Sequence, residues 1–445
     1  MPSRTGAAFF LAVTVGALLF WGAQRDGDRL RLDTYADLQA AIPKAYRGVP
    51  SSIVFDSSTV QSYELTVSDA DWEWLNANEV LEQYVPATLK FGGRVYEDVA
   101  VRYKGSYGAL RFCFNPAGAQ TCKKLSLKLK FNEYDSAGRF FGLRRLNLHA
   151  MEKDATKMHE MLGYEQFRQA GVPAPRTAYA RVTVNGEFVG LFLAVEEIDE
   201  EFIQHAFPDA GKGTLFKDVW PEHLTVEPYT AAVEAGPAKN AEDMPRFAEA
   251  LKAAPDDAFL DTLASWTDLD TLMNFLAVDR LIDNFDGIVG WYCPAGPCYN
   301  HNYFWYKEAF SDRVWLIPWD LDFSFNYPSP IRTFYRMPDW DAPQACNQVK
   351  VFLNIPGRPP SCDPLISRVA AFGREQYASA SRELLAGQFS LERLHARIDE
   401  LSQLVAESVA QDEHGPSVVE WEAAVRKLKV DIGPMRSYIE QKVSR

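Results

Sequence analysis

Alternating apolar and polar positions dominate the first third of the chain and predict β-strands there. Between residues 53 and 131 the alternation recurs with turn residues in between, which is typical of a mostly β region. From Lys124 to Phe131 every second residue is apolar, so the polar residues in between, beginning with Lys124, share the opposite face. The sequence therefore predicts a sheet with one strongly basic face.

The period then changes to that of helices. Residues 154–169 predict a helix, which Pro173 ends, and residues 179–195 predict a hairpin. Its turn, Asn185-Gly186, is a two-residue connection that suits the twist of paired strands.

The second half of the chain reads as mainly helical. Residues 208–257 are rich in Ala, Pro, Glu and Lys, and predict a mobile insertion or a connector with one helix. Asp268 can cap a helix whose apolar residues cover more than one face, so we expect that helix to be buried. Residues 391–443 predict an amphipathic helical end.

The richest polar pattern lies beyond this buried helix. Residues 302–317 predict two strands joined by a tight turn. In a symmetric hairpin Asn302 pairs near Trp319, which brings Asn302 beside Asp320, with Asp322 just beyond. Hard oxygen ligands are therefore expected at one end of the hairpin.

The buried helix delivers two more carboxylates, Asp283 and Asp286, to the same place. The order aspartate, asparagine, hairpin, metal aspartate is that of protein kinases, in which the first aspartate accepts the proton of the attacking hydroxyl. Asp286 takes that role here. Oxygen ligands of this kind suit magnesium or manganese that also holds phosphates. The alternative is that Asp283 and Asp286 only cap or turn the chain, while the strand-end aspartates are solvated.

Net charge argues against one class of function. The formal charge of −14 over 445 residues does not suit a nucleic-acid binder, because affinity for a phosphate backbone needs clustered Lys and Arg. A basic partner is favoured instead.

Two features predict an exported protein. Residues 6–23, after Arg4, are apolar and uncharged, which predicts either an export signal that is removed or a membrane anchor that is kept. Six cysteines fall into three sequence-local pairs, and an even count in an exported chain predicts disulfides ahead of zinc sites or free thiols. The pairs are Cys113 with Cys122, Cys293 with Cys298, and Cys346 with Cys362. We therefore expect a periplasmic, envelope-anchored or secreted protein.

Several short motifs stand in a fixed order between residues 63 and 326. They are Lys104-Gly105-Ser106, Lys124-Leu125-Ser126, Leu146-Asn147-Leu148 with Asp154, Gly171-Val172-Pro173-Ala174-Pro175-Arg176, Asn185-Gly186-Glu187 through Gly190-Leu191 to Glu196, and His301-Asn302-Tyr303 through Pro318-Trp319-Asp320-Leu321-Asp322. Each is weak alone, but together and in order they are specific. In them the chain resembles the spore-coat-protein-H (CotH) kinase family of atypical protein kinase-like proteins.

The resemblance implies an α+β, protein-kinase-like bilobal fold, with a β-rich N-lobe and a mainly helical C-lobe around a nucleotide cleft. The expected division is a signal peptide or anchor at 1–25, a helical lead-in at 26–48, the N-lobe at 49–205, a connector or insertion at 206–260, and the C-lobe at 261–445.

The resemblance also assigns nucleotide-binding residues. Lys124 is expected to neutralise ATP phosphates, with Glu160 as its ion-pair partner ahead of the nearby Glu152 and Glu165. Glu196 either frames the adenine site or merely pairs with a base nearby. Two more residues, Lys104 and Ser106, stand where a phosphate-covering loop belongs, although the glycine spacing around them is not that of a glycine-rich loop.

The implied function is an exported atypical kinase that transfers a phosphoryl group from ATP to Ser or Thr of a protein, itself basic or rich in Ser. Asp286 and Lys124 carry the catalysis, and Mg²⁺ or Mn²⁺ is held by Asn302 and Asp320 with Asp322 in support. The alternative is a non-catalytic cell-surface or envelope binding protein that keeps the kinase-like fold.

Two points decide this interpretation. The stretch 290–299 with its cysteine pair looks inserted against the family pattern, and so could displace Asp286. If Lys124 is buried far from Asn302 and Asp320, the phosphotransferase hypothesis has to be abandoned.

Overall fold

The computed structural model describes residues 50–105, 110, 113, 121–122, 124–294, 296–327, 341, 345–346, 350–352 and 355–444. The apolar N-terminal run at 6–23 and Ser106 lie outside these residues. Within the described part, no helix is both long and apolar enough to cross a membrane. The three predicted disulfides are all present: Cys113–Cys122, Cys293–Cys298 and Cys346–Cys362.

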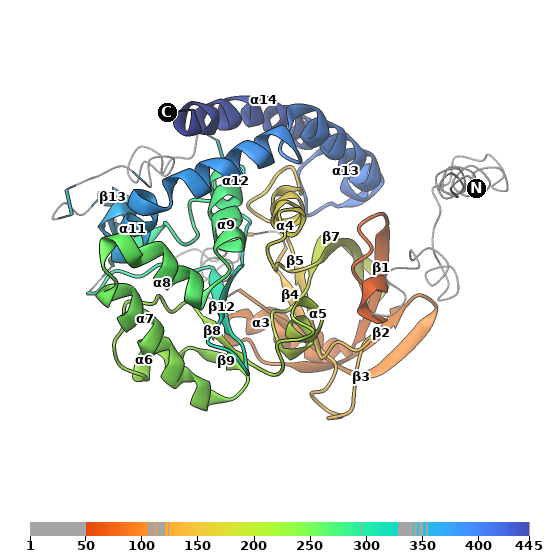
Figure 1. Cartoon of the computed structure of the whole chain (residues 1–445). Coiled ribbons are helices and arrows are strands. Elements are labelled where there is room, and N and C mark those ends of the chain that lie inside the picture. The colour runs from red at the N-terminus through yellow and green to blue at the C-terminus, as the bar shows by residue number, and fades with distance from the viewer. Residues whose placement is uncertain are drawn as a thin grey trace, which may run out of the picture.

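A closed β-barrel forms the N-terminal part of the molecule, on the right of Figure 1. Its strands follow one another around the barrel in the order β1-β2-β3-β4-β5-β7-β6, and a parallel pairing of β1 with β6 closes it. One hydrophobic core fills the interior. The strands are β1 (Val60–Val67), β2 (Val85–Phe91), β3 (Arg94–Tyr103), β4 (Leu127–Lys130), β5 (Arg145–His149), β6 (Thr177–Val184) and β7 (Glu187–Val195).

The barrel confirms the predicted hairpin turn and, within β4 but not at Lys124, the predicted alternation. Along β4, Leu127 and Leu129 are buried, while the lysines that alternate with them are partly exposed. The β6–β7 hairpin turns at Asn185-Gly186, where both residues have positive φ, 51° and 86°. A turn with two positive φ values is the type that paired strands favour.

A second hydrophobic core lies under the helices of the C-terminal part and includes helix α4 (His159–Gln169), which connects β5 to β6. The described residues therefore pack around two main cores, one β-rich and one helical, which confirms the predicted α+β architecture. The other helices are α3 (Asp69–Ala77), α5 (Glu200–Ala206), α6 (Glu227–Ala231), α7 (Asp243–Ala253), α8 (Phe259–Trp266), α9 (Leu269–Leu281), α11 (Pro364–Phe372), α12 (Arg374–Ala386), α13 (Leu391–Gln411) and α14 (Val418–Val443).

Residues 208–257, for which composition predicts a mobile insertion or a connector with one helix, contain more regular structure than that. They contain strands β8 (Thr214–Lys217) and β9 (Val233–Ala235) as well as α6 and α7. Tyr229 and Phe247 from this segment are fully buried in the helical core. Widely spaced aromatic residues thus fix a segment whose average composition suggests a linker.

Two small sheets complete the C-terminal part. One has the order β12-β11-β8-β9, with β11 (Tyr303–Lys307) and β12 (Val314–Pro318) forming the predicted hairpin. The other has the order β10-β14-β13, from β10 (Trp291–Tyr292), β13 (Lys350–Phe352) and β14 (Ile355–Arg358). Helix α9 precedes both and is buried, and Asp268 caps it by accepting the Thr271 N–H at 2.8 Å, as predicted.

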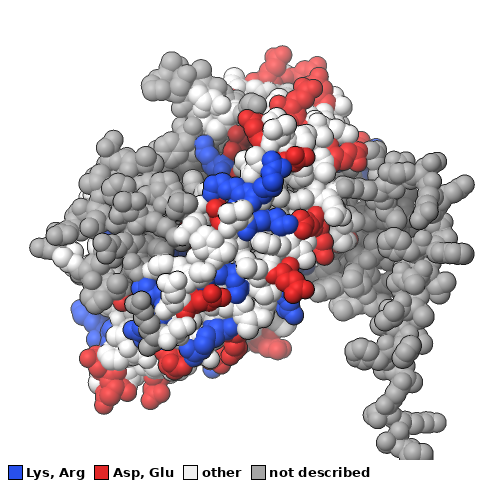
Figure 2. Space-filling model, turned by 90° about the horizontal axis from the view of Figure 1, so that it is seen from above, with Lys and Arg blue, Asp and Glu red and all other residues white. Residues whose placement is uncertain are grey.

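The face formed by α12, α13 and α14, at the top of Figure 1, carries charges of both signs (Figure 2). Lysines and arginines on α14 lie beside carboxylates, as in Lys429 with Asp399 and Arg436 with Glu440, each at 2.8 Å. Opposite charges therefore alternate over this face.

Candidate active site

The β11–β12 hairpin brings Asn302 and Asp320 to the same end, in the predicted register. Tyr303 pairs with Pro318, and the Trp319 N–H donates to the Asn302 carbonyl oxygen at 3.1 Å. Asn302 and Asp320 both have left-handed backbone, with φ of 67° and 52°. Such conformations are uncommon outside glycine and concentrate at functional sites. Asn302 and Asp320, just outside β11 and β12, thus depart from the regular strand conformation.

Asp286 lies in a turn that follows α9 and that buried hydrogen bonds stabilise. Asn284 donates from Nδ2 to Asp279 Oδ1 at 2.8 Å, and Arg280 pairs with Asp279. A Cβ at Gly287 would come within 2.5 Å of Asn284 Nδ2 and so would displace the amide that bonds to Asp279. Buried hydrogen bonds therefore fix the backbone that presents Asp286.

The Asp286 carboxylate is surrounded by donors. Asn302 Nδ2 donates to Asp286 Oδ2 at 3.0 Å and to its carbonyl oxygen at 2.8 Å. The Tyr292 hydroxyl donates to Oδ1, and His301 Nε2 lies 3.4 Å from the same oxygen. Asp286 and Asn302 therefore meet directly, whereas Asp283 stays buried in the preceding turn.

Asp320 and Asp322 lie against helix α4. The Asp320 N–H donates to the Tyr164 hydroxyl at 3.0 Å, and His159 Nδ1 lies 3.3 Å from the Asp322 carbonyl oxygen. Both aromatic rings belong to α4. Packing against that helix holds the segment that follows β12.

Four carboxylates, Asp286, Asp320, Asp322 and Glu160, influence one another, and we call them the carboxylate cluster. Burial raises the pKa of Asp322 well above its ordinary value, and the charges of Asp320, Glu160 and Asp286 raise it further. Burial and Glu160 also raise the pKa of Asp320. The described residues contain no ready-made group of three or more His, Cys, Asp or Glu side chains arranged to hold a metal ion.

Lys104 adds positive charge near this cluster and opposes the rise in the pKa of Asp320. It follows β3, and its Nζ lies 2.7 Å from His149 Nε2, while His149 Nδ1 lies 2.9 Å from both Glu160 oxygens. Its ammonium also lies 5.3 Å from the centre of the Trp319 ring. Burial lowers the pKa of Lys104 to about 8, against an opposing effect of Asp320. A histidine thus connects Lys104 to Glu160.

The expected pairing of Lys124 with Glu160 is wrong. Lys124 is buried, and its Nζ donates to Asp412 Oδ2 at 2.6 Å and to the Leu191 carbonyl oxygen at 2.8 Å. Its other charged neighbours, Lys157 and Glu152, are outside the carboxylate cluster. Lys124 precedes β4, so the polar face of that strand does not extend to it. Lys124 therefore lies away from the carboxylate cluster, so the phosphoryl-transfer hypothesis in the form that places Lys124 at the phosphates has to be abandoned.

Glu196 also forms ion pairs outside the carboxylate cluster. Arg176 and His205 both contact its carboxylate, His205 Nε2 at 2.7 Å. This is the second of the two roles that the sequence left open, pairing with a nearby base. The next residue, Glu197, contacts Lys128 and Asn147, each at 2.6 Å, and lies near Lys104.

Sequence reasoning missed several supporting residues. His149 follows Asn147 at the two-residue spacing of β5, so its place on the same strand face was readable from the alternation. Asp218 was not readable: its Oδ1 accepts the Asn302 N–H at 2.8 Å across 84 residues of chain. Tyr292 lies in the stretch that looked inserted.

Known proteins share features with this chain. The family model described as CotH kinase protein matches residues 101–443. The inner spore coat protein H of Bacillus subtilis (strain 168) is 24% identical over 277 residues, which cover 60% of this chain and 69% of that protein. The crystal structure of the Helicobacter pylori proinflammatory kinase CtkA covers 75% of this chain and 97% of its own at 12% identity, with a TM-score of 0.33. A TM-score this low supports no inference about the chain.

Proposed function

Because the chain belongs to the CotH kinase protein family, we propose that it is an atypical kinase that transfers a phosphoryl group from ATP to a Ser or Thr hydroxyl of a protein. The observation that carries the proposal is the Asn302–Asp286 hydrogen bond at 3.0 Å, formed at the hairpin end that also presents Asp320. Phosphoryl transfer needs positioning and charge neutralisation more than covalent chemistry from the protein. A base, an amide ligand and carboxylates at one place meet that need.

The donor set fits a hard divalent cation. Asn302 uses its Nδ2 on Asp286, which leaves its amide oxygen as an acceptor, and Asp320 and Asp322 add carboxylates. Magnesium and manganese prefer such oxygens and usually bind only one or two carboxylates together with substrate phosphates. The carboxylates also raise one another's pKa, a repulsion that a cation relieves. We propose Asn302, Asp320 and Asp322 as the residues that would hold Mg²⁺ or Mn²⁺, which neutralises phosphate charge when bound.

The remaining residues act on the nucleotide and on the acceptor. Lys104 neutralises phosphate charge, and Glu160 orients it through His149. Asp286 orients the acceptor hydroxyl and takes up its proton as the new phosphate ester bond forms and the bond to the leaving ADP breaks. We no longer place Lys124 or Glu196 at the nucleotide, because each is committed to a buried ion pair.

Charge and disulfides support a proposal for the location and the acceptor. Three disulfides are typical of proteins outside the reducing cytoplasm, so we propose that the chain acts as a periplasmic, envelope-anchored or secreted protein. With its net charge of −14, it favours a basic protein acceptor.

The test is phosphate transfer by the purified protein with ATP and Mg²⁺ or Mn²⁺. We expect labelling of the protein itself or of a basic, Ser-rich protein, and its loss in Asp320→Ala and Asp286→Ala. The surface variant Asp399→Ala is the matched control and should label normally. Equal labelling by Asp320→Ala would remove the assignment.

Nucleotide binding is tested separately by thermal denaturation. A ligand that binds only the folded state raises the melting temperature. No shift with any nucleotide, with or without the cation, would favour the non-catalytic binding protein.

A further inference from the structure

We infer that Tyr292 is a positioning residue for Asp286 and that the Cys293–Cys298 disulfide keeps it in place. The inference rests on the proposed function, in which Asp286 handles the acceptor hydroxyl. The stretch that looked inserted would then support the site.

The contacts at Asp286 show what Tyr292 contributes. Asn302 holds Oδ2 at 3.0 Å, whereas the Tyr292 hydroxyl donates to Oδ1. Because each carboxylate oxygen accepts a hydrogen bond from a different residue, the group cannot rotate about its Cβ–Cγ bond. A donor on one oxygen alone would leave that rotation less restricted. His301 Nε2, 3.4 Å from the same oxygen, adds a longer and weaker contact, so the short bond to Oδ1 comes from Tyr292.

The Tyr292 side chain is only 9% exposed, and its backbone is held from two sides. Its N–H and carbonyl oxygen bond to Tyr299 at 2.8 and 2.9 Å, and the Cys293 N–H bonds to the Pro356 carbonyl oxygen at 2.7 Å. The disulfide joins Cys293, next to Tyr292, to Cys298, next to Tyr299. It therefore closes the backbone bridge that carries the phenol.

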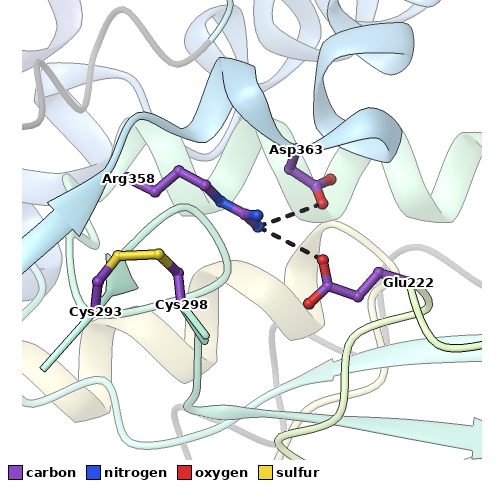
Figure 3. Close-up of a disulfide and its surroundings, with 5 residues drawn as sticks. All are labelled: Glu222, Cys293, Cys298, Arg358 and Asp363. Atoms are coloured by element: carbon purple, nitrogen blue, oxygen red, sulfur yellow. Dashed lines mark ion pairs between the residues drawn. A yellow bond between two sulfur atoms is a disulfide. The ribbon is translucent and has the colours of Figure 1, made fainter. Parts of the chain in front are cut away.

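Figure 3 shows the disulfide close to Arg358. The Arg358 guanidinium lies over the Trp291 ring, 3.7 Å from its centre, and its Nη2 is 3.7 Å from Glu222 and 3.8 Å from Asp363. Trp291 pairs with Arg358 through the backbone as well. The residue before Tyr292 is thus fixed independently of the disulfide, so breaking the disulfide frees one side of the bridge and not the whole strand.

The decisive variant is Tyr292→Phe, which removes the hydroxyl and keeps the ring. We expect kcat for phosphate transfer to fall about tenfold, the rate equivalent of one hydrogen bond. KM for ATP and the nucleotide-dependent melting shift should stay unchanged, because neither depends on the acceptor carboxylate. Tyr299→Phe, on the other side of the bridge, is the matched control and should keep its kcat.

The disulfide is tested by replacing both cysteines, Cys293→Ser with Cys298→Ser, which should lower kcat in the same way. The control replaces the Cys113–Cys122 pair, which belongs to the barrel core. An unchanged kcat in Tyr292→Phe would overturn the inference and leave the proposed function standing. A rise in KM for ATP together with the fall in kcat would also overturn it, because a general structural role gives that result.

Absence of transfer by the wild-type protein would instead overturn the proposed function. In that case a crystal structure of Tyr292→Phe tests whether Tyr292 orients the Asp286 carboxylate, because this test needs no enzymatic activity. The inference requires the Asp286 carboxylate to have rotated, and an unmoved carboxylate would end it.

Discussion

At the scale of single residues, Lys104 and Lys124, both of which were expected from the sequence to lie at the nucleotide phosphates, have different environments. Lys104 lies among the groups of the carboxylate cluster, whereas Lys124 is enclosed with Asp412. A buried ion pair is costly to break, because the partner left behind keeps its charge without solvent. Lys124 therefore stabilises the fold, whereas Lys104 is the lysine that we propose for the nucleotide phosphates.

We expect Lys124→Met to destabilise the fold by about 3–5 kcal/mol, because it leaves Asp412 buried without its cation. Lys104→Met should cost less stability but abolish the nucleotide-dependent melting shift. Urea denaturation and thermal shift with ATP analogue and Mn²⁺ measure the two effects. Adding Asp412→Asn to Lys124→Met is the control and should restore part of the loss.

The opposite result would return the phosphate-binding role to Lys124. In that result the Lys124→Met variant folds but no longer binds nucleotide, whereas the Lys104→Met variant still binds it.

Sequence patterns predicted the contacts of the site that are local in the sequence, but not those between residues far apart in it. The pairing of Asn302 near Trp319 follows from strand alternation and turn length within about twenty residues, and it was predicted correctly. The enclosure of Lys124 depends on Asp412, 288 residues further along, and no local pattern reports such a partner. His149 lies between these cases, because its strand face was readable but its contact with Glu160 was not.

At the scale of elements, the C-terminal helices hold α4, which carries Glu160. Arg397 on α13 donates to both oxygens of Glu165 on α4, at 3.0 and 2.8 Å. Trp421 on α14 donates from Nε1 to the Thr156 carbonyl oxygen at 3.1 Å, just before α4 begins. The amphipathic pattern of residues 391–443 predicted these helices but not the face they cover, since that depends on tertiary contacts.

We expect Arg397→Ala to loosen α4, because the two-oxygen contact is partly buried and charge-assisted. The loss should be about 1–3 kcal/mol. Hydrogen exchange of peptides that cover α4 should become faster. The control is Arg426→Ala, whose exposed pair with Glu422 at 3.5 Å should contribute almost nothing. Unchanged exchange in α4 would show that the apolar contacts alone hold it.

At the scale of the whole molecule, Glu196 connects segments that lie far apart in the sequence. Arg176, which contacts it just before β6, also bonds to Ser51, and His205 approaches it from α5. Burial alone raises the pKa of Glu196, but Arg176 and His205 outweigh burial and lower that pKa from 4.5 to about 2. Ionised Glu196 therefore stabilises the fold.

The sign of the pH dependence follows from this lowered pKa. The stabilisation by Glu196 is fully present above the unfolded pKa of about 4.5 and is lost as the pH falls towards about 2. We expect the free energy of unfolding to decrease by a few kcal/mol over that window, and Glu196→Gln to flatten the decrease. Urea denaturation between pH 5 and about 2.5 measures it. Glu187→Gln, at an exposed position, is the control, and equal slopes in both variants would contradict the expectation.

The closure of the barrel has a consequence for how this chain matures. β1 pairs with β6 in parallel, so that Val60 meets Tyr179. A polypeptide that emerges amino end first cannot complete that ladder until more than a hundred further residues have followed. Long-range parallel pairing forms slowly, and an unpaired strand invites association with other chains. One edge of β1 therefore stays unpaired until β6 has been made, and during that time assembly of the barrel competes with aggregation.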